Sequence, residues 1–298
     1  MPVRHALLAL LVVFIWGTNF VVIKVGLAAF PPLLFATLRF AFCALPLVFF
    51  IPRPKLPIVR IAAFGVLQGV GTIGLMFLAM KSDISPGLAS LVIQVQVFFT
   101  IIASRTFFKE TVAAFQRVAL GLAAAAIALI AWQSAVHSSS AVTLLGLGLT
   151  LGAGASWAGT NIISRSFAGA NTFHVMAWSS VFAAMSLLVA TLVVEGGQAD
   201  IEALEAFSLS GWGAVMWQSL GNTLFGFGIW TWLLGRYPAA SITPFALLVP
   251  IFGIVTSAWL TGESLPAWKS GAVALLMLGL AANYYAARIK RLSVSRAA

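Results

Sequence analysis

Charged residues are scarce in this chain. They account for 8% of its 298 residues, with 7 Asp and Glu against 17 Lys and Arg, whereas a soluble domain carries about 25%. Hydrophobic residues make up 61%, and the mean hydropathy is +1.04. This composition excludes a soluble globule and predicts a protein whose solvent is the lipid bilayer.

Residues for redox chemistry, metal binding and catalysis are also few. The single cysteine, Cys43, lies in an apolar run and cannot form an internal disulfide. No sequence pattern typical of a metallopeptidase or a serine hydrolase occurs, so we expect neither an enzyme nor a bound metal or cofactor. None of the 7 acidic residues falls in the middle of an apolar run. A carboxylate proton relay is therefore not expected, and facilitated diffusion or exchange is the simpler mechanism.

The apolar residues are grouped in runs near the ~20 residues that a helix needs to cross a bilayer. A continuous run without two-residue alternation predicts a helix, which satisfies its own backbone hydrogen bonds in lipid. We thus predict an all-α integral membrane protein with ten transmembrane helices. They lie at about residues 5–28, 31–51, 57–80, 85–105, 112–132, 141–164, 172–194, 209–235, 239–261 and 266–287.

The net charge of +10 is unevenly distributed between these runs. If the N-terminus is cytoplasmic, 13 basic residues lie in the inner segments and 3 in the outer ones. This bias predicts that both termini are cytoplasmic and that the chain lies in the inner membrane. Arg4 precedes a run too long for a signal peptide, so we expect that run to remain as a transmembrane helix. Nucleic-acid binding is not expected, because no basic patch is interleaved with aromatic residues.

Features of the first half recur in the second half in the same order, which indicates an internal duplication. Each copy has five predicted helices, an odd number, so the second copy enters the membrane from the opposite side. Such inverted repeats place a site near the midplane. The predicted parts are two repeats at 1–133 and 141–288, a linking loop at 134–140 and a basic cytoplasmic tail at 289–298. The matching positions are Trp16–Asn19 with Trp157–Asn161, Gln68 and Thr72 with Gln218 and Asn222, and Glu110 with Glu263.

Short motifs in both halves resemble those of one family. They are Trp16-Gly17-Thr18-Asn19-Phe20, Leu38-Arg39-Phe40, Val249-Pro250-Ile251 and Gly262-Glu263, within about residues 8–132 and 142–285. In these motifs the chain resembles the EamA-type transporters of the drug/metabolite transporter superfamily. The resemblance implies ten helices with both termini inside and export of small metabolites, commonly amino acids. Tryptophan-rich members that export aromatic amino acids look most similar.

Polar and aromatic side chains in the middle of apolar runs are the candidate substrate site, because an unsatisfied polar group is costly in lipid. Trp16 and Asn19 share a helical face, as do Trp157 and Asn161, and we expect the two segments to face each other across a substrate path. Tryptophans could sandwich a flat or apolar side chain while the amides bind an ammonium or a carboxylate. The alternative is that these side chains only join helices by hydrogen bonds. The remaining candidates are Gln68, Thr72, Gln94, Trp217, Gln218 and Asn222.

The two halves differ in the fourth and ninth runs, where Gln94 and Gln96 of the first half correspond to the apolar Leu247 and Val249 of the second half. Adjacent positions on a helix diverge by about 100 degrees, so Gln94 and Gln96 point about 200 degrees apart. Only one of the two glutamines is therefore expected to line a path.

Arg39 is the one basic residue placed well inside a run. It is a candidate for attracting a substrate carboxylate, with snorkelling or bonding to backbone carbonyls as the alternative. Pro244 and Pro250 remove backbone donors from the ninth run and should kink it or let it bend as a gate, with a static kink as the alternative. Glu110 and Glu263 adjoin helix N-termini and are interpreted as helix caps.

The sequence thus predicts a secondary transporter that exports small metabolites by alternating access around a central cavity, with aromatic or other apolar amino acids preferred. Its partners would be a small-molecule substrate and the bilayer. Export of other metabolites or of amphipathic drugs is an alternative, and a membrane channel is an alternative of another class. The exact substrate, the direction of transport, proton coupling and the oligomeric state stay open, and a monomer is compatible with the sequence.

Overall fold

Helices form nearly all of the regular structure in the computed structural model, which describes residues 1–136, 142–237 and 239–297. This part of the chain contains no β-strand, only an isolated bridge between Ile84 and Val142. The all-α prediction is confirmed. The helices are α1 (Val3–Ala29), α2 (Pro32–Val48), α3 (Ile58–Val66), α4 (Leu75–Ser82), α5 (Pro86–Val92), α6 (Gln96–Phe108), α7 (Ala114–Val136), α8 (Leu144–Ser164), α9 (Thr172–Val194), α10 (Gly197–Glu205), α11 (Leu209–Met216), α12 (Gly228–Arg236), α13 (Ala239–Ile242), α14 (Val249–Thr261) and α15 (Ala267–Ala297).

Five shorter stretches, η1 to η5, continue these helices with a different hydrogen-bond pattern. Those inside long segments are η1 (Leu67–Gly74), η2 (Ile93–Val95), η4 (Trp217–Phe227) and η5 (Thr243–Leu248), while η3 (Arg165–Phe167) follows α8. With them, the described residues form ten long helical segments at the places of the ten predicted runs. By length and composition, six candidate spans among these residues are able to cross a membrane. Of the predicted linking loop at 134–140, residues 134–136 belong to α7, and 137–141 lie outside the described residues.

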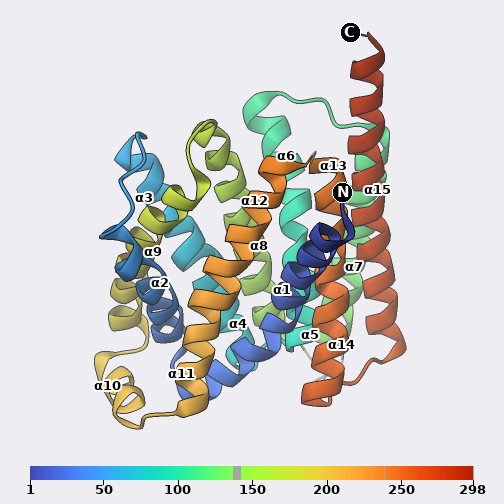
Figure 1. Ribbon diagram of the computed structural model, residues 1–298. Helices are drawn as coiled ribbons and strands as arrows, with labels where there is room; N and C mark the ends of the chain where they lie inside the picture. Colours follow the sequence, from blue (N-terminus) through green and yellow to red (C-terminus); the bar gives the residue numbers. More distant parts are fainter. Residues whose placement is uncertain (137–141, 238, 298) are drawn as a thin grey trace.

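The two halves of the chain are intertwined (Figure 1). The first helix, α1, packs against α11, η4 and α14 of the second half, and α8 packs against η1, α4 and α6 of the first half. Likewise α2 lies along α9, and α7 lies along α15. Close crossings require small residues: a Cβ added to Gly17 of α1 would lie 2.4 Å from the Cβ of Phe252 in α14. The most extensive helix packing therefore runs between the halves.

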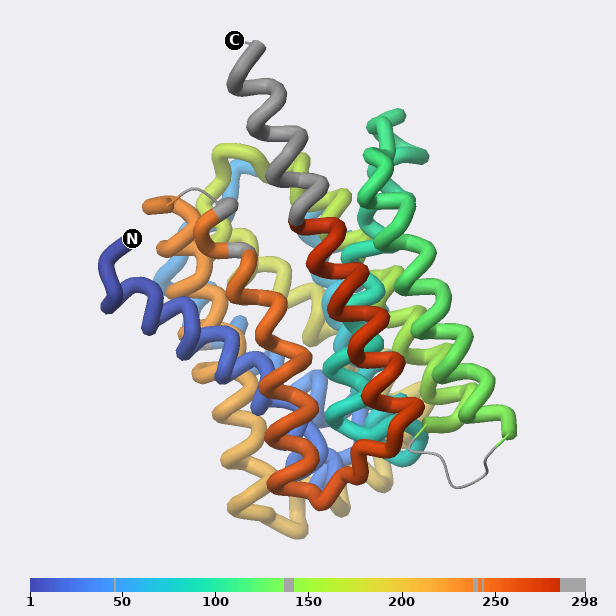
Figure 2. Tube along the Cα trace, turned by 90° about the vertical axis from the view of Figure 1, so that its right-hand side faces the viewer, coloured from blue at the N-terminus to red at the C-terminus, as the bar shows by residue number. Residues whose placement is uncertain are grey.

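Two ends of the bundle can be distinguished in both views. The start of α1 and the red end of α15 lie toward the upper end of the bundle in Figure 2. The α14–α15 turn lies at the lower end in Figure 1. The terms upper end and lower end are used below in this sense.

Irregular stretches interrupt the helices at related places in the two halves. Both η1 and η4 are π-helical and hold the paired polar residues of the third and eighth runs. Such stretches free backbone carbonyls and occur often at functional sites. Here a threonine hydroxyl donates to one such carbonyl in each stretch. The Oγ1 of Thr72 donates to Leu67 O (3.0 Å), and the Oγ1 of Thr223 donates to Gln218 O (2.8 Å).

The fourth and ninth segments are broken differently, by the 3₁₀ turns η2 and η5. Pro244 lies in the first turn of η5, and Pro250 lies in the first turn of α14. Proline fits a first turn because its missing N–H has no helical partner there. The ninth run is thus irregular at the two prolines that were expected to kink it or let it bend, and their role in gating stays a prediction.

The turns after α6 and α14 share a left-handed residue, and this similarity allows a stability prediction. Lys109 has φ 54° and Gly262 has φ 66°. Left-handed backbone costs a residue with a Cβ about 1 kcal/mol, whereas glycine adopts it freely. Lys109→Gly should therefore stabilise the protein by about 1 kcal/mol, as a higher midpoint of thermal unfolding in detergent.

The matched change is Gly262→Ala, because an added Cβ at Gly262 would meet no atom within 4 Å. It should destabilise by about the same amount through the backbone alone. Equal midpoints for the wild type and Lys109→Gly would contradict the assigned strain.

Candidate functional site

A buried arginine connects the second helix to the π-helical stretch of the eighth segment. Arg39 in α2 is 4% exposed and Gln218 in η4 is 0% exposed. The Nη1 of Arg39 donates to Gln218 Oε1 (2.7 Å), and its Nη2 donates to Thr223 Oγ1 (3.2 Å). Ser219 Oγ donates to the carbonyl oxygen of Arg39 (3.0 Å). We call Arg39, Gln218, Ser219 and Thr223 the Arg39 cluster.

The Arg39 cluster has hydrogen-bond donors to spare and no acid. Neither of the two ion pairs among the described residues includes Arg39. The Nε of Arg39 and the Nε2 of Gln218 are buried without a hydrogen-bond partner, whereas buried polar groups are normally paired. The predicted alternative of bonding to backbone carbonyls is wrong, because the bonds of Arg39 go to two side chains. Snorkelling and attraction of a substrate carboxylate stay predictions.

Trp16 lies on the face of α1 that packs against η4, where its ring also contacts Phe227. The indole Nε1 of Trp16 donates to the carbonyl oxygen of Asn222 (3.3 Å). Gly226 makes room for the ring, because an added Cβ would lie 2.6 Å from Trp16 Nε1. Asn19 is buried, and its Oδ1 has no hydrogen-bond partner. The sequence thus correctly selected buried polar residues here, but their part in substrate binding stays a prediction.

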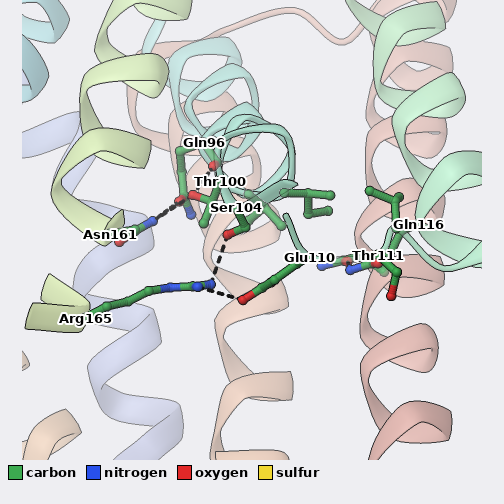
Figure 3. A pocket seen from close by; sticks show the side chains of 12 residues that line it. Gln96, Thr100, Ser104, Glu110, Thr111, Gln116, Asn161 and Arg165 are labelled. Atoms are coloured by element: carbon green, nitrogen blue, oxygen red, sulfur yellow. Dashed lines mark hydrogen bonds and ion pairs between the residues drawn. The ribbon is translucent and has the colours of Figure 1, made fainter. Parts of the chain in front are cut away.

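A second polar cluster surrounds a cavity of about 380 Å³ between α6, α7, α8 and α15, which we call the upper pocket. Asn161 of α8 points at α6, and its Nδ2 donates to Gln96 Oε1 (2.8 Å) and Thr100 Oγ1 (3.0 Å), as Figure 3 shows. Gln96, and not Gln94, lines this pocket. The lining of the pocket includes no aromatic residue.

An ion pair lies at the mouth of the upper pocket. Arg165 Nη1 donates to Glu110 Oε1 (2.7 Å), and Arg165 Nη2 donates to Ser104 Oγ (2.9 Å) (Figure 3). The side chains of Arg165 and Glu110 are 41% and 46% exposed. The guanidinium also lies 4.6 Å from the ring centre of Phe108. Arg165 is thus oriented from two sides while it remains accessible.

The remaining candidates are distributed around these clusters. Gln68 and Gln94 are half-buried and make no hydrogen bond with another described residue through their side chains. Trp157 is half-buried against the core, and Trp217 is exposed. The bonds of Trp16 go to η4 and those of Asn161 to α6, and no hydrogen bond within the described ranges joins the two segments. They therefore belong to two separate polar clusters instead of one.

At the lower end a largely buried carboxylate joins three helices, and it also borders a cavity of about 310 Å³. Glu263 and Lys269 form an ion pair, and their side chains are 7% and 1% exposed. The carboxylate of Glu263 also accepts hydrogen bonds from the Ser85 and Ser257 hydroxyls and from Gly87 N (2.9 Å). We call these five residues the lower seal. It joins the start of α5 to the end of α14 and the start of α15.

The surroundings of Glu263 favour its charged form. Burial by itself would raise the pKa of this carboxyl. Hydrogen bonds from Lys269, Ser257 and Ser85 outweigh burial and hold the pKa below its ordinary value. Glu263 is therefore ionised at neutral pH.

The two repeated glutamates differ from their predicted role as helix caps. Glu263 does accept a backbone N–H at a helix start, but the helix is α5 of the other half. For Glu110 the prediction is wrong, because its hydrogen bond comes from Arg165, and Gln116 accepts the Ala113 N–H at the start of α7. The cause is tertiary: the turn at 109–113 directs Glu110 toward α8.

Sequence reasoning missed Arg165, Ser104, Ser85 and Lys269. One signal could have found part of this set: a serine precedes the repeated glutamate by six residues in both halves, as Ser104 before Glu110 and Ser257 before Glu263. Ser104 accepts a hydrogen bond from Arg165, the partner of Glu110, and Ser257 donates one to Glu263. Arg165 and Ser85 come from other segments and have no such signal.

Long apolar helices, a polar pocket at one end and a buried carboxylate network at the other are features of a membrane transporter. The chain belongs to the EamA-like transporter family, which matches it over residues 4–132 and again over 144–285. It is accordingly a transporter and not an enzyme, and it is a multi-pass protein of the inner membrane.

Several relatives are similar along most of the chain. A "Probable amino-acid metabolite efflux pump" of Salmonella typhimurium is 36% identical and one of Escherichia coli is 35% identical, with 97% of each chain covered. An "Uncharacterized inner membrane transporter YedA" of Escherichia coli is 27% identical over 89% of this chain and 85% of its own. One crystal structure has the same fold, with a TM-score of 0.61 at 18% identity over 96% of this chain and 97% of that one.

Proposed function

We propose that this transporter exports amino acids by alternating access and that the described conformation is open at its upper end. One observation carries the proposal. Both repeated glutamates border a cavity, but the Glu110–Arg165 pair is 46% and 41% exposed, whereas the Glu263–Lys269 pair of the lower seal is 7% and 1% exposed. Two related positions in opposite states, at opposite ends, are expected of a transporter that opens one side at a time.

The proposed orientation places the upper end in the cytoplasm. The basic residues of the loops support it, since 13 of them lie on the side of the N-terminus and 3 on the other. Ten membrane crossings and two inverted five-helix repeats belong to the same proposal. They are supported by the two family matches and by the paired π-helical stretches η1 and η4.

Amino acids are the proposed substrate class because two relatives at 35% and 36% identity carry names of amino-acid metabolite efflux pumps. The aromatic preference rests on sequence resemblance and on Trp16 and Trp157. The upper pocket favours a second candidate, small polar amino acids, because glutamine, asparagine, threonine and serine line it and aromatic residues do not. The carboxylate of either kind of substrate could be attracted by the spare donors of Arg39 and Gln218.

The proposed movement is a rocking of the third, fourth, eighth and ninth segments about their breaks in η1, η2, η4 and η5. Irregular stretches inside long helices often mark functional hinges. Pro244 and Pro250 would act as hinges in the ninth segment. No acid lies in the middle of a segment to relay protons. The proposed mechanism is therefore facilitated diffusion or exchange, neither of which needs a titrating group.

The test is transport into liposomes that contain the purified full chain. Labelled phenylalanine and labelled serine are each offered with and without a pH gradient and with unlabelled competitors. Saturable, competed uptake of one of them without a gradient supports the proposal and selects between the two candidates. Uptake that does not saturate would favour a channel, and the absence of transport for both would overturn the amino-acid assignment.

Asn161 provides a prediction for this site. Asn161→Ala removes the donor to Gln96 and Thr100 from the wall of the upper pocket. We expect initial transport rates to fall about tenfold, since a hydrogen bond of this kind contributes about 1 kcal/mol or slightly more. The matched control is Ser166→Ala, an exposed neighbour that bonds only to its own helix. Unchanged transport in a well-inserted Asn161→Ala protein would remove this residue from the site.

A further inference from the structure

The upper pocket carries a pair of opposite charges at its mouth, and these charges have unused hydrogen-bonding capacity. Glu110 uses only Oε1, for Arg165, and Oε2 has no partner within the described residues. Arg165 has five N–H donors, and its bonds to Glu110 and Ser104 are made by Nη1 and Nη2. An acceptor on one residue and donors on the other therefore remain available beside a cavity of about 380 Å³.

The pair is inexpensive to open. An ion pair with both side chains more than 40% exposed contributes only about 0–1 kcal/mol to stability. The Ser104 hydroxyl and the Phe108 ring would still orient the guanidinium after Glu110 moved away. The buried Glu263–Lys269 pair at the lower end has no such freedom, because its members are 7% and 1% exposed.

We propose that Glu110 and Arg165 form the cytoplasmic loading site for the two charged groups of a zwitterionic amino acid. The α-ammonium binds Glu110, and the α-carboxylate binds the Arg165 guanidinium, so that one weak internal ion pair is exchanged for two charge-assisted contacts. Asn161, Gln96 and Thr100, deeper in the pocket, then face the side chain of the ligand. This inference rests on the proposed amino-acid export. It assigns a binding role to Glu110, which was expected to be a helix cap, and to Arg165, for which the sequence predicted no role.

The geometry makes both charges of the ligand necessary. A molecule with a carboxylate and no ammonium leaves Glu110 displaced from Arg165 without a new partner. A molecule with an ammonium and no carboxylate separates Arg165 from Glu110 and likewise gives Arg165 no new partner. The site should therefore discriminate against serinamide and against N-acetylserine, which each lack one of the two charges of serine.

Each residue has its own expected signature in liposomes that contain the full chain. Labelled serine and labelled phenylalanine are the probes, and serinamide and N-acetylserine are the competitors. Glu110→Gln should raise KM about tenfold and lose most of the discrimination against N-acetylserine, while it keeps the discrimination against serinamide. Arg165→Gln should raise KM similarly and lose the discrimination against serinamide only. The tenfold figure corresponds to one charge-assisted hydrogen bond.

A charge-exchanged protein separates binding from a structural ion pair. The double variant Glu110→Arg with Arg165→Glu restores opposite charges at the same two positions. A purely structural pair would be rescued by this exchange, with KM and discrimination returning to wild-type values. We expect thermal stability to return while KM stays raised at least tenfold, because the ligand would have to bind reversed, with its side chain away from Asn161.

Arg105→Gln and Lys109→Gln are the matched controls, because both line the adjacent cavity of about 530 Å³ and neither lines the upper pocket. They should leave KM and discrimination unchanged. If the wild type transports an amino acid and the Glu110 and Arg165 variants keep its KM and discrimination, the loading site is overturned and the proposed function stands. If the wild type transports neither serine nor phenylalanine, both are overturned.

Discussion

Glu263→Gln should open the lower end of the transporter and shift the protein toward the conformation that faces the other side. The change leaves Lys269, 1% exposed, without its anion. It also replaces an acceptor of four hydrogen bonds by an amide that can accept with only one oxygen. Breaking one side of a buried ion pair costs about 3–5 kcal/mol. Part of this cost will appear as lower thermal stability and part as a larger population with the seal open.

The measurement is the reactivity of a cysteine behind the seal. Ser90 is fully buried and packs at Gly253 of α14, so Ser90→Cys in a Cys43→Ala background places one thiol just inside the seal. A membrane-impermeant maleimide added from the outside should label this thiol at least tenfold faster after Glu263→Gln. Glu110→Gln, at the other end, is the matched control and should not raise outside labelling. Equal labelling rates with and without Glu263→Gln would contradict the role of the seal.

Acid should act on the same seal with a defined sign. The pKa of Glu263 is lowered in the folded protein, so its contribution to stability is complete above its ordinary pKa and is lost as pH falls through the lowered value. The labelling rate of the Ser90→Cys thiol, divided by the rate of the denatured protein at the same pH to remove the loss of thiolate, should therefore increase only in strongly acidic medium. In the Glu263→Gln protein this acid-dependent increase should be absent.

Arg39→Ala should abolish transport and lower stability more than any other arginine substitution in the described chain. It removes two charge-assisted hydrogen bonds, each worth about 1.5–3 kcal/mol. Thr223 Oγ1 loses its donor, and Gln218 Oε1 keeps only the Nδ2 of Asn222 at 3.5 Å. The expected loss is about 3 kcal/mol or more, visible as a lower unfolding midpoint in detergent. Arg39→Lys keeps the charge but cannot reach both acceptors with a planar fork, and we expect partial stability with little transport.

Arg105→Ala is the control for Arg39→Ala, because Arg105 lies exposed near the end of α6 and makes no hydrogen bond with another described residue. It should leave both stability and transport within the error of the wild type. Normal transport by a stable Arg39→Gln protein would show that the guanidinium holds helices together and has no part in attracting a carboxylate.

The long helices could be predicted from the sequence because each lipid-exposed helix must satisfy its own backbone within one apolar run. The polar pairs were found for a related reason, since Gln218 and Asn222 lie four residues apart in a greasy segment and prove to be buried together. Arg39 was found because a basic residue inside such a run is rare. Each of these features depends on residues close together in the sequence, so the sequence alone could predict it.

The rest depends on contacts between distant segments. The π-helical form of η1 and η4 arises from a shift of hydrogen bonds by one residue, which has no pattern of its own in the amino acids. The pairing of Glu110 with Arg165 joins residues 55 positions apart. The choice between Gln94 and Gln96 could be framed by the helical wheel, but it was decided by the position of α8.

The intertwined packing has a consequence for how this protein is made. Helix α1 is synthesised first, yet its main neighbours are α11, η4 and α14, which leave the ribosome some 200 residues later. During that time the α1 surface with Gly17, Trp16 and Asn19 must be covered by lipid or by the insertion machinery. Two separately expressed halves, each stable to insertion but incomplete alone, should become protected from proteolysis only when they meet in the same membrane.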